Sequence, residues 1–433
     1  MSISAFVKAS VASWLTSEFK LNMKRRRAEL GRRFARRPHE VFYFHRADDP
    51  YCQLMVQALP DLSARFDIEI KPRVVERLPA NMYPDPARFE AYSILDASKL
   101  ARLYGLGFPL SALVPDRLSV GMANRFLASK QDDPNFFAIA EEVGAALWRQ
   151  DLKAIKQLCA SADINEATLS DNERSLRSLG HYASATLYYE GEFYAGLDRL
   201  DHLERRLNQF GIGDGEVHFE LTRLWRHSLD NLEKSIAGRS VEVFFSVRSP
   251  YSYLGLQMIA EFAKRSGVHL KLKPVLPMLM RGLAVPPAKG RYILFDTARE
   301  ARQEHISFGR IVDPLGSATK RAMAIGFALM EEEKGSDQEL ALPFFKAFTR
   351  GVWAEGIDGS TDKGLEKILA NSGLPLNKLE KALAEDDWQD KAEKNRQEML
   401  MYGSWGVPTF RAAGETLWGQ DRLWAIIEAL KQQ

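Results

Sequence analysis

The 433-residue sequence predicts an α/β protein made of two tandem copies of one domain, each with a central mixed sheet and a large helical insertion. Three observations support this fold class. Short motifs recur in the same order in the two halves of the chain. Each half opens with a strand, a helix and a second strand. Because the helix forms a right-handed crossover between the two strands, these strands are expected to be parallel. Each half closes with two strands joined by a short turn, which makes them antiparallel, and with a last helix.

The evidence for the repeat is a set of short motif pairs, each of which would be a weak match by itself. The matched segments are "VFYFHRADDPYCQLM" (41–55) with "VFFSVRSPYSYLGL" (243–256) after one inserted residue, "IKP" (70–72) with "LKP" (272–274), "YSILD" (92–96) with "YILFD" (292–296), "GHYASATL" (180–187) with "GSWGVPTF" (403–410), and "GEFYAGLDRL" (191–200) with "GETLWGQDRL" (414–423). They divide the chain into a basic helical arm (1–38), a first domain copy (39–210), a helical connection (211–238) and a second domain copy (239–433).

The arm has apolar residues at helical spacing and then eight Lys and Arg within Lys24–Arg37. Such a segment is a helix that packs on the body or stands in solvent, or a helix that binds a membrane surface or a partner. Both alternatives remain open at this point. The connection starts at the turn-rich "GIGDGE" (211–216) and continues as a short helix over 217–236.

Composition excludes several classes of protein. The net charge is only +2, so no overall field favours nucleic acid or membrane, and no apolar run reaches the roughly 18 residues of a membrane span. The two cysteines, Cys52 and Cys159, form neither a CxxC motif nor a metal-binding pattern. A protein without a metal site, in a reducing cytoplasm, is the expectation.

The elements of the second copy follow in order. The strand "VEVFFSV" (241–247) is rich in β-branched and aromatic residues, and a helix begins directly after it. The strand "VHLKLKPV" (268–275) comes next, followed by about 100 residues of mostly helical sequence. "GVPTF" (406–410), a turn at "AAGET" and the helix "DRLWAIIEALKQ" (421–432) complete the domain.

Ser249 and Pro250 mark the junction of the first strand and the first helix. Serine is a preferred N-cap residue, and proline suits the first helical position, where a missing N–H costs nothing. A helix N-terminus also stabilises an anion, so the Ser249 hydroxyl could instead donate to a thiolate and lower the pKa of that thiol. No His–Asp pair accompanies Ser249, which disfavours a serine hydrolase.

Three other stretches carry candidate functional residues. Pro408 precedes an apolar strand, in either a cis turn or a trans strand edge. Asp421 lies at the start of the last helix, as an N-cap or first-turn residue or as a ligand for an amino group. Lys289, with the arginines that follow it, could hold a carboxylate or form a solvated ion-paired helix face.

These motifs occur together in one known family, and the second copy resembles it over essentially all of 239–433. It is similar to the 2-hydroxychromene-2-carboxylate isomerases and the kappa-class glutathione transferases, in the DsbA-like branch of the thioredoxin fold. The matching motifs are the serine-proline junction "SPYSY" (249–253), "PAKGRYILFD" (287–296), "GVPTF" (406–410) and "WGQDRL" (418–423).

The resemblance implies a glutathione-binding site in the second copy. Ser249 would lie beside the glutathione sulfur, with Tyr251 next to it. Val407, before a cis Pro408, would pair its backbone with the cysteinyl part. The remaining implied ligands are Gln420 and Asp421 at the γ-glutamyl end, Lys289 at the carboxylates, and Asp296, which in family dimers reaches a neighbour's glutathione. The family's asparagine before the Pro-Pro segment is missing from "RGLAVPP" (281–287).

The first copy departs from the family pattern, with Asp49 in place of the serine and Ala185 in place of the cis proline. It is interpreted as a degenerate copy that keeps the fold and forms an intramolecular pseudo-dimer with the second copy; a further homodimer stays open. Cys52 is either a reactive thiol or a buried, inert one.

The resemblance implies a glutathione-dependent isomerase or transferase that acts on a small aromatic or other electrophilic substrate. A dithiol–disulfide oxidoreductase of the DsbA type is the first alternative, which the missing CxxC disfavours. A non-catalytic thioredoxin-fold binding protein is the second.

Overall fold

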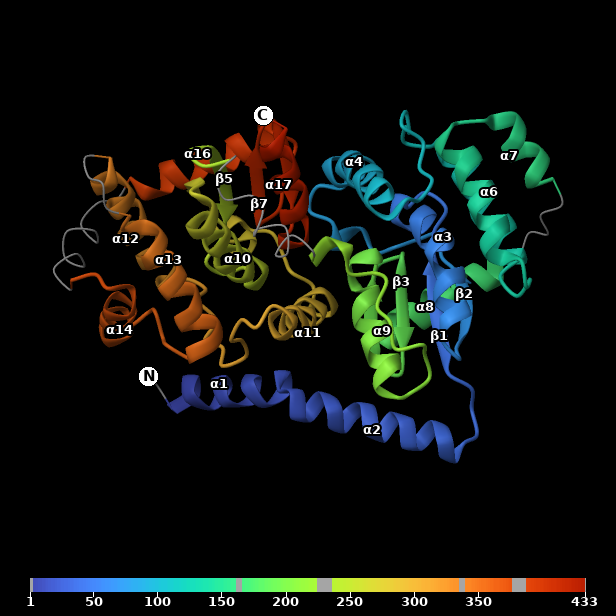
Figure 1. Cartoon of the computed structure of the whole chain (residues 1–433), viewed down its shortest axis with the longest axis horizontal. Coiled ribbons are helices and arrows are strands. Elements are labelled where there is room, and N and C mark those ends of the chain that lie inside the picture. Colours follow the sequence, from blue (N-terminus) through green and yellow to red (C-terminus); the bar gives the residue numbers. More distant parts are fainter. Residues whose placement is uncertain (1–2, 161–165, 224–235, 335–338, 376–386, 433) are drawn as a thin grey trace. The chain divides into compact units, whose positions relative to one another are not determined.

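The structure is a computed structural model that describes residues 3–160, 166–223, 236–334, 339–375 and 387–432. It divides into two compact units, one formed by residues 1–22 and 225–433 and the other by residues 23–224. Each unit contains one four-stranded mixed sheet surrounded by helices (Figure 1). The predicted α/β class with a mixed sheet in each copy is therefore confirmed.

The sheet of the 23–224 unit has the order β2-β1-β3-β4. β1 pairs in parallel with β2, and β3 is antiparallel to both β1 and β4. The strands are β1 (Glu40–His45), β2 (Glu69–Val74), β3 (Thr186–Tyr189) and β4 (Glu192–Ala195). The helices are α3 (Pro50–Arg65), α4 (Pro86–Tyr104), α5 (Arg117–Ser129), α6 (Phe136–Trp148), α7 (Leu152–Leu158), α8 (Glu166–Leu179) and α9 (Leu200–Gln209), with short 3-10 turns η1 (Ala80–Met82) and η2 (Leu197–Arg199).

The sheet of the other unit repeats this topology, in the order β6-β5-β7-β8. Its strands are β5 (Ser240–Phe245), β6 (His269–Pro274), β7 (Thr409–Ala412) and β8 (Glu415–Trp418). Its helices are α10 (Pro250–Ser266), α11 (Pro287–Gln303), α12 (Ser317–Glu333), α13 (Ala341–Arg350), α14 (Asp362–Ser372), α16 (Trp388–Met401) and α17 (Leu423–Lys431), with 3-10 turns η4 (Met278–Arg281) and η6 (Gln420–Arg422) and a π-helical turn η5 (Gly351–Glu355).

The register of the two copies corrects one detail of the sequence comparison. Glu40 pairs with Glu69 in β1–β2, and Ser240 pairs with His269 in β5–β6. The first strands are thus equivalent at a constant offset of 200 positions, without the expected inserted residue. The same offset makes Asp49 equivalent to Ser249 and Cys52 equivalent to Ser252.

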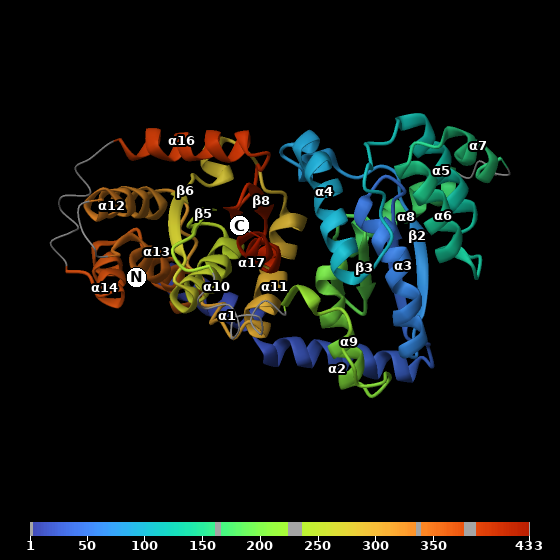
Figure 2. The same cartoon turned by 45° about the horizontal axis from the view of Figure 1, so that its top comes forward.

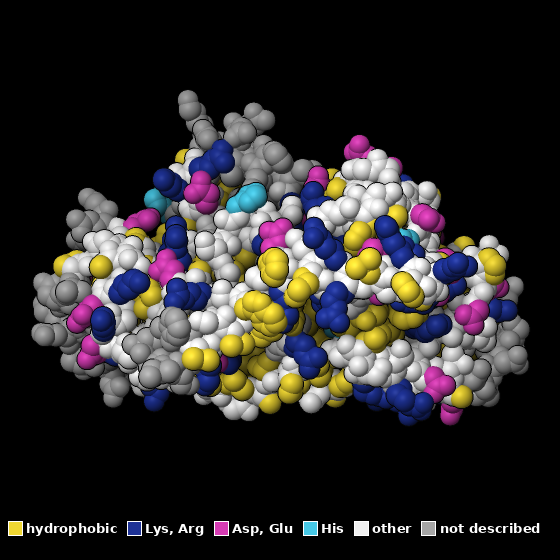
Figure 3. All heavy atoms as spheres, turned by 90° about the horizontal axis from the view of Figure 1, so that it is seen from below, with side chains coloured by type: hydrophobic (Ala, Val, Ile, Leu, Met, Phe, Trp, Pro, Cys, Tyr) yellow, Lys and Arg dark blue, Asp and Glu magenta, His cyan; other side chains and the backbone are white. Residues whose placement is uncertain are grey.

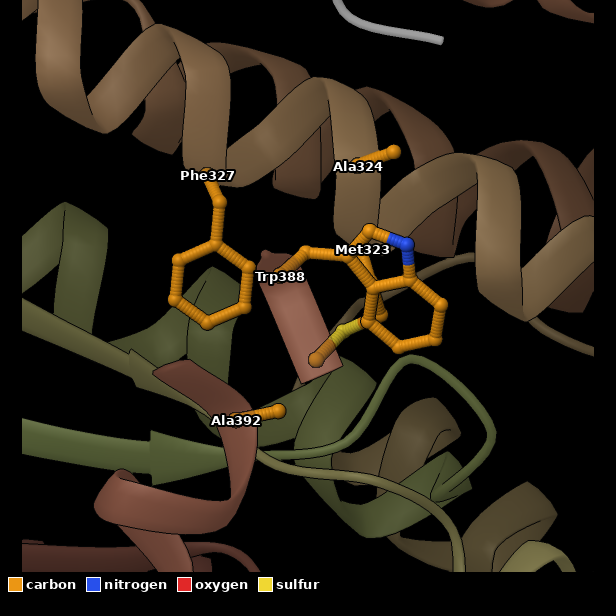
Figure 4. Packing of buried hydrophobic residues seen from close by; sticks show 5 residues of the cluster. All are labelled: Met323, Ala324, Phe327, Trp388 and Ala392. Carbon is orange, nitrogen blue, oxygen red and sulfur yellow. The ribbon is translucent and has the colours of Figure 1, made fainter. Parts of the chain in front are cut away.

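The helical insertion of the second copy has a core of its own. Trp388 and Ala392 of α16 pack against Met323, Ala324 and Phe327 of α12, and all five side chains are buried (Figure 4). Figure 2 shows α16 beside α12 and β6.

The arm consists of α1 (Ile3–Thr16) and α2 (Glu18–Phe34), so its predicted helical character is observed. Within the unit that contains β5, Arg302 of α11 donates to the carbonyl oxygen of Thr16 at 2.9 Å. Within the other unit, the guanidinium of Arg25 donates twice to the carboxylate of Glu192 at 2.7 and 2.8 Å. α1 is thus anchored on the unit that contains β5, and the part of α2 that begins at Met23 is anchored on the 23–224 unit.

Two sequence expectations concern the chain outside the domains. The helix predicted over 217–236 falls largely on 224–235, which lie outside the described residues. Among the helices that the structure describes, none has the length and apolar character needed to cross a membrane.

Candidate functional site

The strand–helix junction of the second copy is formed as the sequence predicts. β5 ends at Phe245, and α10 begins at Pro250 with Ser249 as its N-cap. The backbone N–H of Ser252 donates to the Ser249 hydroxyl oxygen at 3.1 Å. Ser249 is half-buried and satisfies one of the N–H groups that the first turn of a helix leaves unpaired.

Ser249 also contacts the turn before β7, far along the chain. Its hydroxyl donates to the carbonyl oxygen of Val407 at 3.4 Å, and the peptide bond between Val407 and Pro408 is cis. Pro408 is buried, whereas Val407 is half-buried. The fold thus brings together Ser249 and the Val407-Pro408 turn.

A further backbone contact joins the Pro408 turn to the start of the last helical segment. The N–H of Gly419 donates to the Pro408 carbonyl oxygen at 2.8 Å. Gln420 and Asp421 follow directly, in η6, and the Gln420 amide donates to Asp421 Oδ1 at 3.1 Å. Asp421 lies in the first turn of this segment, while the N-cap position is held by Gly419. Gln420 and Asp421 are therefore placed beside the cis turn.

A second group of predicted residues lies on α11. The Tyr251 hydroxyl donates to Asp296 Oδ2 at 2.7 Å, and Arg299 pairs with the other carboxylate oxygen. Asp296 is only 2% exposed, so this carboxylate is held inside the domain. Lys289 lies seven positions before Asp296 on the same helix, and burial lowers the pKa of its ammonium group below the ordinary value. Tyr251 connects this group to the start of α10.

Two residues that sequence reasoning missed support the junction. Ser252 accepts the backbone N–H of Ser246 at 3.2 Å and so ties α10 to the end of β5. Gly255 allows close packing, because a Cβ there would lie 3.1 Å from the Phe410 ring and 3.2 Å from Pro408 Cγ. A sequence signal for this exists in the repeat. At the two contacting positions, the second copy has the small Gly255 and the larger Pro408, whereas the first copy has the large Met55 and the small Ala185.

The partners of Ser249 limit what its hydroxyl can do. It accepts from one backbone N–H and donates to one backbone carbonyl, and neither group can take up its proton. The serine is therefore not activated as a nucleophile. It can instead donate its hydrogen bond to an anion at the positive end of α10.

The first copy keeps the scaffold of the junction but changes its chemistry. Asp49 caps α3, accepting from the Tyr51 N–H at 3.0 Å and from the Ser184 hydroxyl at 2.6 Å. Burial raises the pKa of the Asp49 carboxyl above its ordinary value. Ala185, at the cis-proline position, adopts a left-handed backbone with φ of 51°.

Two contacts of the second copy are repeated in the first. Gly196 donates to the carbonyl oxygen of Ala185 at 2.7 Å, as Gly419 does to Pro408. The Tyr51 hydroxyl donates to Asp96 at 2.8 Å, as Tyr251 does to Asp296. The Tyr–Asp pair thus belongs to the architecture that both copies share.

Cys52 has the environment of a structural residue. It is fully buried and accepts the Arg46 N–H on its sulfur at 3.3 Å, in the same way that Ser252 accepts the Ser246 N–H. Burial raises the pKa of the Cys52 thiol well above its ordinary value, and raises that of Cys159 to about 11. Both thiols are free and buried, which favours inert thiols over reactive ones.

Comparison with known proteins relates the second copy to one family. Residues 240–431 match the family described as DSBA-like thioredoxin domain. Glutathione S-transferase kappa 1 of Rattus norvegicus is 24% identical over 204 residues, covering 43% of this chain and 88% of the relative. The 2-hydroxychromene-2-carboxylate isomerase of Sphingobium xenophagum is 23% identical over 201 residues, covering 43% and 94%. A solved structure of a 2-hydroxychromene-2-carboxylate isomerase aligns at 23% identity with a TM-score of 0.37, covering 45% of this chain and 95% of its own.

Proposed function

Because residues 240–431 match the DSBA-like thioredoxin domain family, we propose that the chain is a glutathione-dependent isomerase or transferase acting on a small aromatic or other electrophilic molecule. The observation that carries the proposal is the position of Ser249. Its hydroxyl lies at the N-terminus of α10 and within 3.4 Å of the Val407 carbonyl oxygen, next to the cis turn. The names of the two relatives, a glutathione transferase and an isomerase, give the reaction classes.

The donor set of this region fits glutathione. The tripeptide carries a thiol, a γ-glutamyl ammonium group and two carboxylates. The Ser249 hydroxyl and the α10 N-terminus suit the thiolate, and the half-buried backbone of Val407 suits the cysteinyl peptide groups. Asp421 suits the ammonium group, and Lys289 suits a carboxylate. The segment 281–287 offers no asparagine, so that part of the tripeptide needs another ligand.

Bound glutathione supplies a thiolate that can add to a carbon–carbon double bond of the substrate, after which it leaves again in an isomerase or stays bonded to the product in a transferase. Ser249 is proposed to turn its hydroxyl from the Val407 carbonyl toward that sulfur. Its oxygen keeps the N–H of Ser252 as a donor during this rotation, so the α10 cap is retained. The hydrogen bond and the helix N-terminus both favour the charged sulfur, and both therefore lower the pKa of the thiol.

The proposal assigns the chemistry to the second copy. At the equivalent position of the first copy, the carboxyl of Asp49 would repel a thiolate and raise the pKa of the thiol. Exchange between dithiols and disulfides fits the chain less well. That reaction needs an accessible thiol and a resolving thiol, whereas Cys52 and Cys159 are both buried and lie in no CxxC motif.

The experiment that tests the role of Ser249 is a titration of the thiol of bound glutathione. Ultraviolet absorbance of the thiolate would be followed against pH for the wild type, Ser249→Ala and Ser249→Thr. We expect Ser249→Ala to raise the pKa of the bound thiol by about one unit, worth about 1.4 kcal/mol, and Ser249→Thr to leave it close to the wild-type value. An unchanged thiol pKa in Ser249→Ala, with glutathione still bound, would overturn the assignment.

A second titration tests the proposed γ-glutamyl contact. Calorimetry would compare glutathione with cysteinylglycine, which lacks the γ-glutamyl group. Asp421→Asn should weaken glutathione binding about tenfold and leave cysteinylglycine binding unchanged, because only the first ligand carries the ammonium group in question. Equal weakening of both ligands would contradict the contact.

A further inference from the structure

The helix α2 has its polar and apolar faces reversed with respect to an ordinary surface helix. The side facing the 23–224 unit is charged: Arg25 forms a double hydrogen bond with Glu192, and the buried Glu29 pairs with Arg32. The opposite side carries large apolar residues. Leu30 is 67% exposed and Phe34 is 96% exposed. Surface helices of globular proteins normally bury such side chains against the core.

The exposed apolar residues form one stripe along α2. Phe19, Met23, Leu30 and Phe34 are spaced by four, seven and four positions, which places them on one face of a helix with 3.6 residues per turn. The apolar stripe consists of two pairs, Phe19 with Met23 and Leu30 with Phe34, and the turn between the pairs carries the exposed Arg26 and Arg27. Large apolar side chains gathered on one exposed helix face mark a surface that binds a partner or a membrane.

Basic side chains flank the apolar stripe on both sides. On the helix circumference, Arg26 and Arg33 lie next to one edge and Arg27 next to the other, and all three are exposed. The acidic residues of α2 are Glu18 at its start and Glu29, which faces inward. Hydrogen bonds from Arg32 and Arg33 lower the pKa of Glu29 to about 2, so it stays charged and paired. Figure 3, which looks at the side on which α2 lies in Figure 1, shows patches of hydrophobic side chains with Lys and Arg among them.

We propose that the exposed face of α2 binds the surface of an anionic phospholipid membrane. In such an arrangement the helix lies in the plane of the interface, with its apolar stripe among the acyl chains and its flanking arginines at the phosphates. The anchoring of α2 by Arg25 and Glu192 fits this orientation, because it fixes the helix with the apolar stripe outward before any lipid is present.

The charge of this face argues against the other occupants. A second copy of the chain would bring Arg26, Arg27 and Arg33 against the same arginines, and like charges in contact repel. A nucleic acid would use the arginines but leave the large apolar residues in water. A bilayer with anionic headgroups satisfies the apolar and the basic side chains together.

The test is sedimentation of the full-length protein with vesicles of phosphatidylcholine, alone or with about a quarter of the lipid replaced by phosphatidylglycerol. Binding is expected on the anionic vesicles and should weaken as salt is raised, because the arginine–phosphate attraction is screened. Phe34→Ser and Leu30→Ser should each lower the partition coefficient about tenfold. Leu152→Ser is the matched control, since Leu152 is an exposed leucine of the same unit in α7.

Each other outcome counts against the proposal. It is overturned by failure to sediment with anionic vesicles, by equal losses in Leu30→Ser and Leu152→Ser, or by undiminished binding of the Phe34→Ser protein. Light scattering without lipid tests whether this face of α2 binds a second copy of the chain instead. A wild-type dimer that becomes a monomer in Phe34→Ser would show that it does. Thermal unfolding followed by circular dichroism should be the same for all variants, because the exchanged side chains are exposed.

Discussion

The hydroxyl of Ser249 lies 3.4 Å from the carbonyl oxygen of Val407, so the residue that caps α10 also contacts the residue before cis Pro408. One side chain thus has a structural role and a proposed chemical role. The two roles can be separated by experiment, because the first copy contains a residue that performs only one of them.

Ser249→Asp should keep the cap and remove the proposed chemistry. Asp49 already caps α3 through its carboxylate, with the Ser184 hydroxyl as a second donor. The equivalent of Ser184 is Val407, so Ser249→Asp combined with Val407→Ser should leave the free energy of unfolding within about 0.5 kcal/mol of the wild type. Ser249→Ala should lower it by about 1 kcal/mol. Urea unfolding measures this difference. Both variants should lose glutathione-dependent turnover, and retention of turnover by the doubly substituted variant would contradict the thiolate role.

The repeat offers a matched pair for the Tyr–Asp contact. Tyr251→Phe and Tyr51→Phe each remove a hydroxyl that donates to a buried carboxylate, Asp296 or Asp96. Each should lower the free energy of unfolding by about 1–3 kcal/mol. Only Tyr251→Phe should also weaken glutathione binding in calorimetry. Equal weakening of glutathione binding by Tyr51→Phe would show that the Tyr–Asp contact affects the site only by stabilising the fold.

Gly255 should tolerate no larger residue. Gly255→Val would place branched methyl groups against Pro408 and Phe410, where even a Cβ comes within 3.2 Å. We expect a loss of about 2 kcal/mol in stability from overpacking and weaker glutathione binding from displacement of the Val407 turn. Gly31→Val in α2 is the control, because a Cβ there has no neighbour within 4 Å. Thermal unfolding and calorimetry measure the two effects, and equal unfolding temperatures of the two variants would contradict this packing.

His45 should make the 23–224 unit sensitive to acid. Burial lowers the pKa of its imidazole from the ordinary 6.5 to about 3, so folding favours the neutral form. Its contribution to stability is fully present above pH 6.5 and is lost as the pH falls toward 3, by several kcal/mol in total. His45→Phe introduces the residue found at the equivalent position, Phe245, and should flatten this part of the stability–pH profile. Parallel profiles for both proteins between pH 6.5 and 3 would refute the assignment.

The two cysteines should be unreactive in the folded protein. Since burial raises the pKa of both thiols, alkylation by iodoacetamide at neutral pH should be slow for Cys52 and Cys159 and become rapid after unfolding in urea. Mass spectrometry of each peptide reports the two rates. Cys52→Ser, which copies Ser252, should leave turnover unchanged. Rapid alkylation of folded Cys52, together with reduction of insulin disulfides, would favour the oxidoreductase alternative.

The topology could be predicted from the sequence because it depends on local signals. Short apolar strands, a helix directly after the first of them, and a turn between the last two strands appear in both copies. The alignment of β1 with β5 was wrong by two positions, because it placed Val41 on Val243, whereas the strand register makes Val41 equivalent to Val241. A shift of two positions leaves every side chain on the same face of its strand, so the hydrophobic pattern does not detect it and only strand pairing fixes the register.

The candidate site could be predicted only in part. The Ser249 cap involves only α10 and the residue before it, so it follows from local spacing. The close approach of Gly255 to Pro408 was missed because it joins residues about 150 positions apart, and its only sequence signal is the exchange of residue sizes at these two positions between the copies. The cis isomer of the Val407-Pro408 bond could not be predicted from the sequence, because cis and trans differ by only about 1 kcal/mol before tertiary contacts act.

The unit that carries Ser249 is assembled from both ends of the chain, residues 1–22 and 225–433. During synthesis, α1 therefore leaves the ribosome long before α11, to which Arg302 and Thr16 later bind it. The 23–224 unit can therefore complete its sheet before α11 has been synthesised and can bind α1. A fragment that begins at residue 239 would have the whole sheet and Ser249 but would lack this cover over the helix that carries Lys289 and Asp296. Glutathione binding is therefore best measured on the full-length chain.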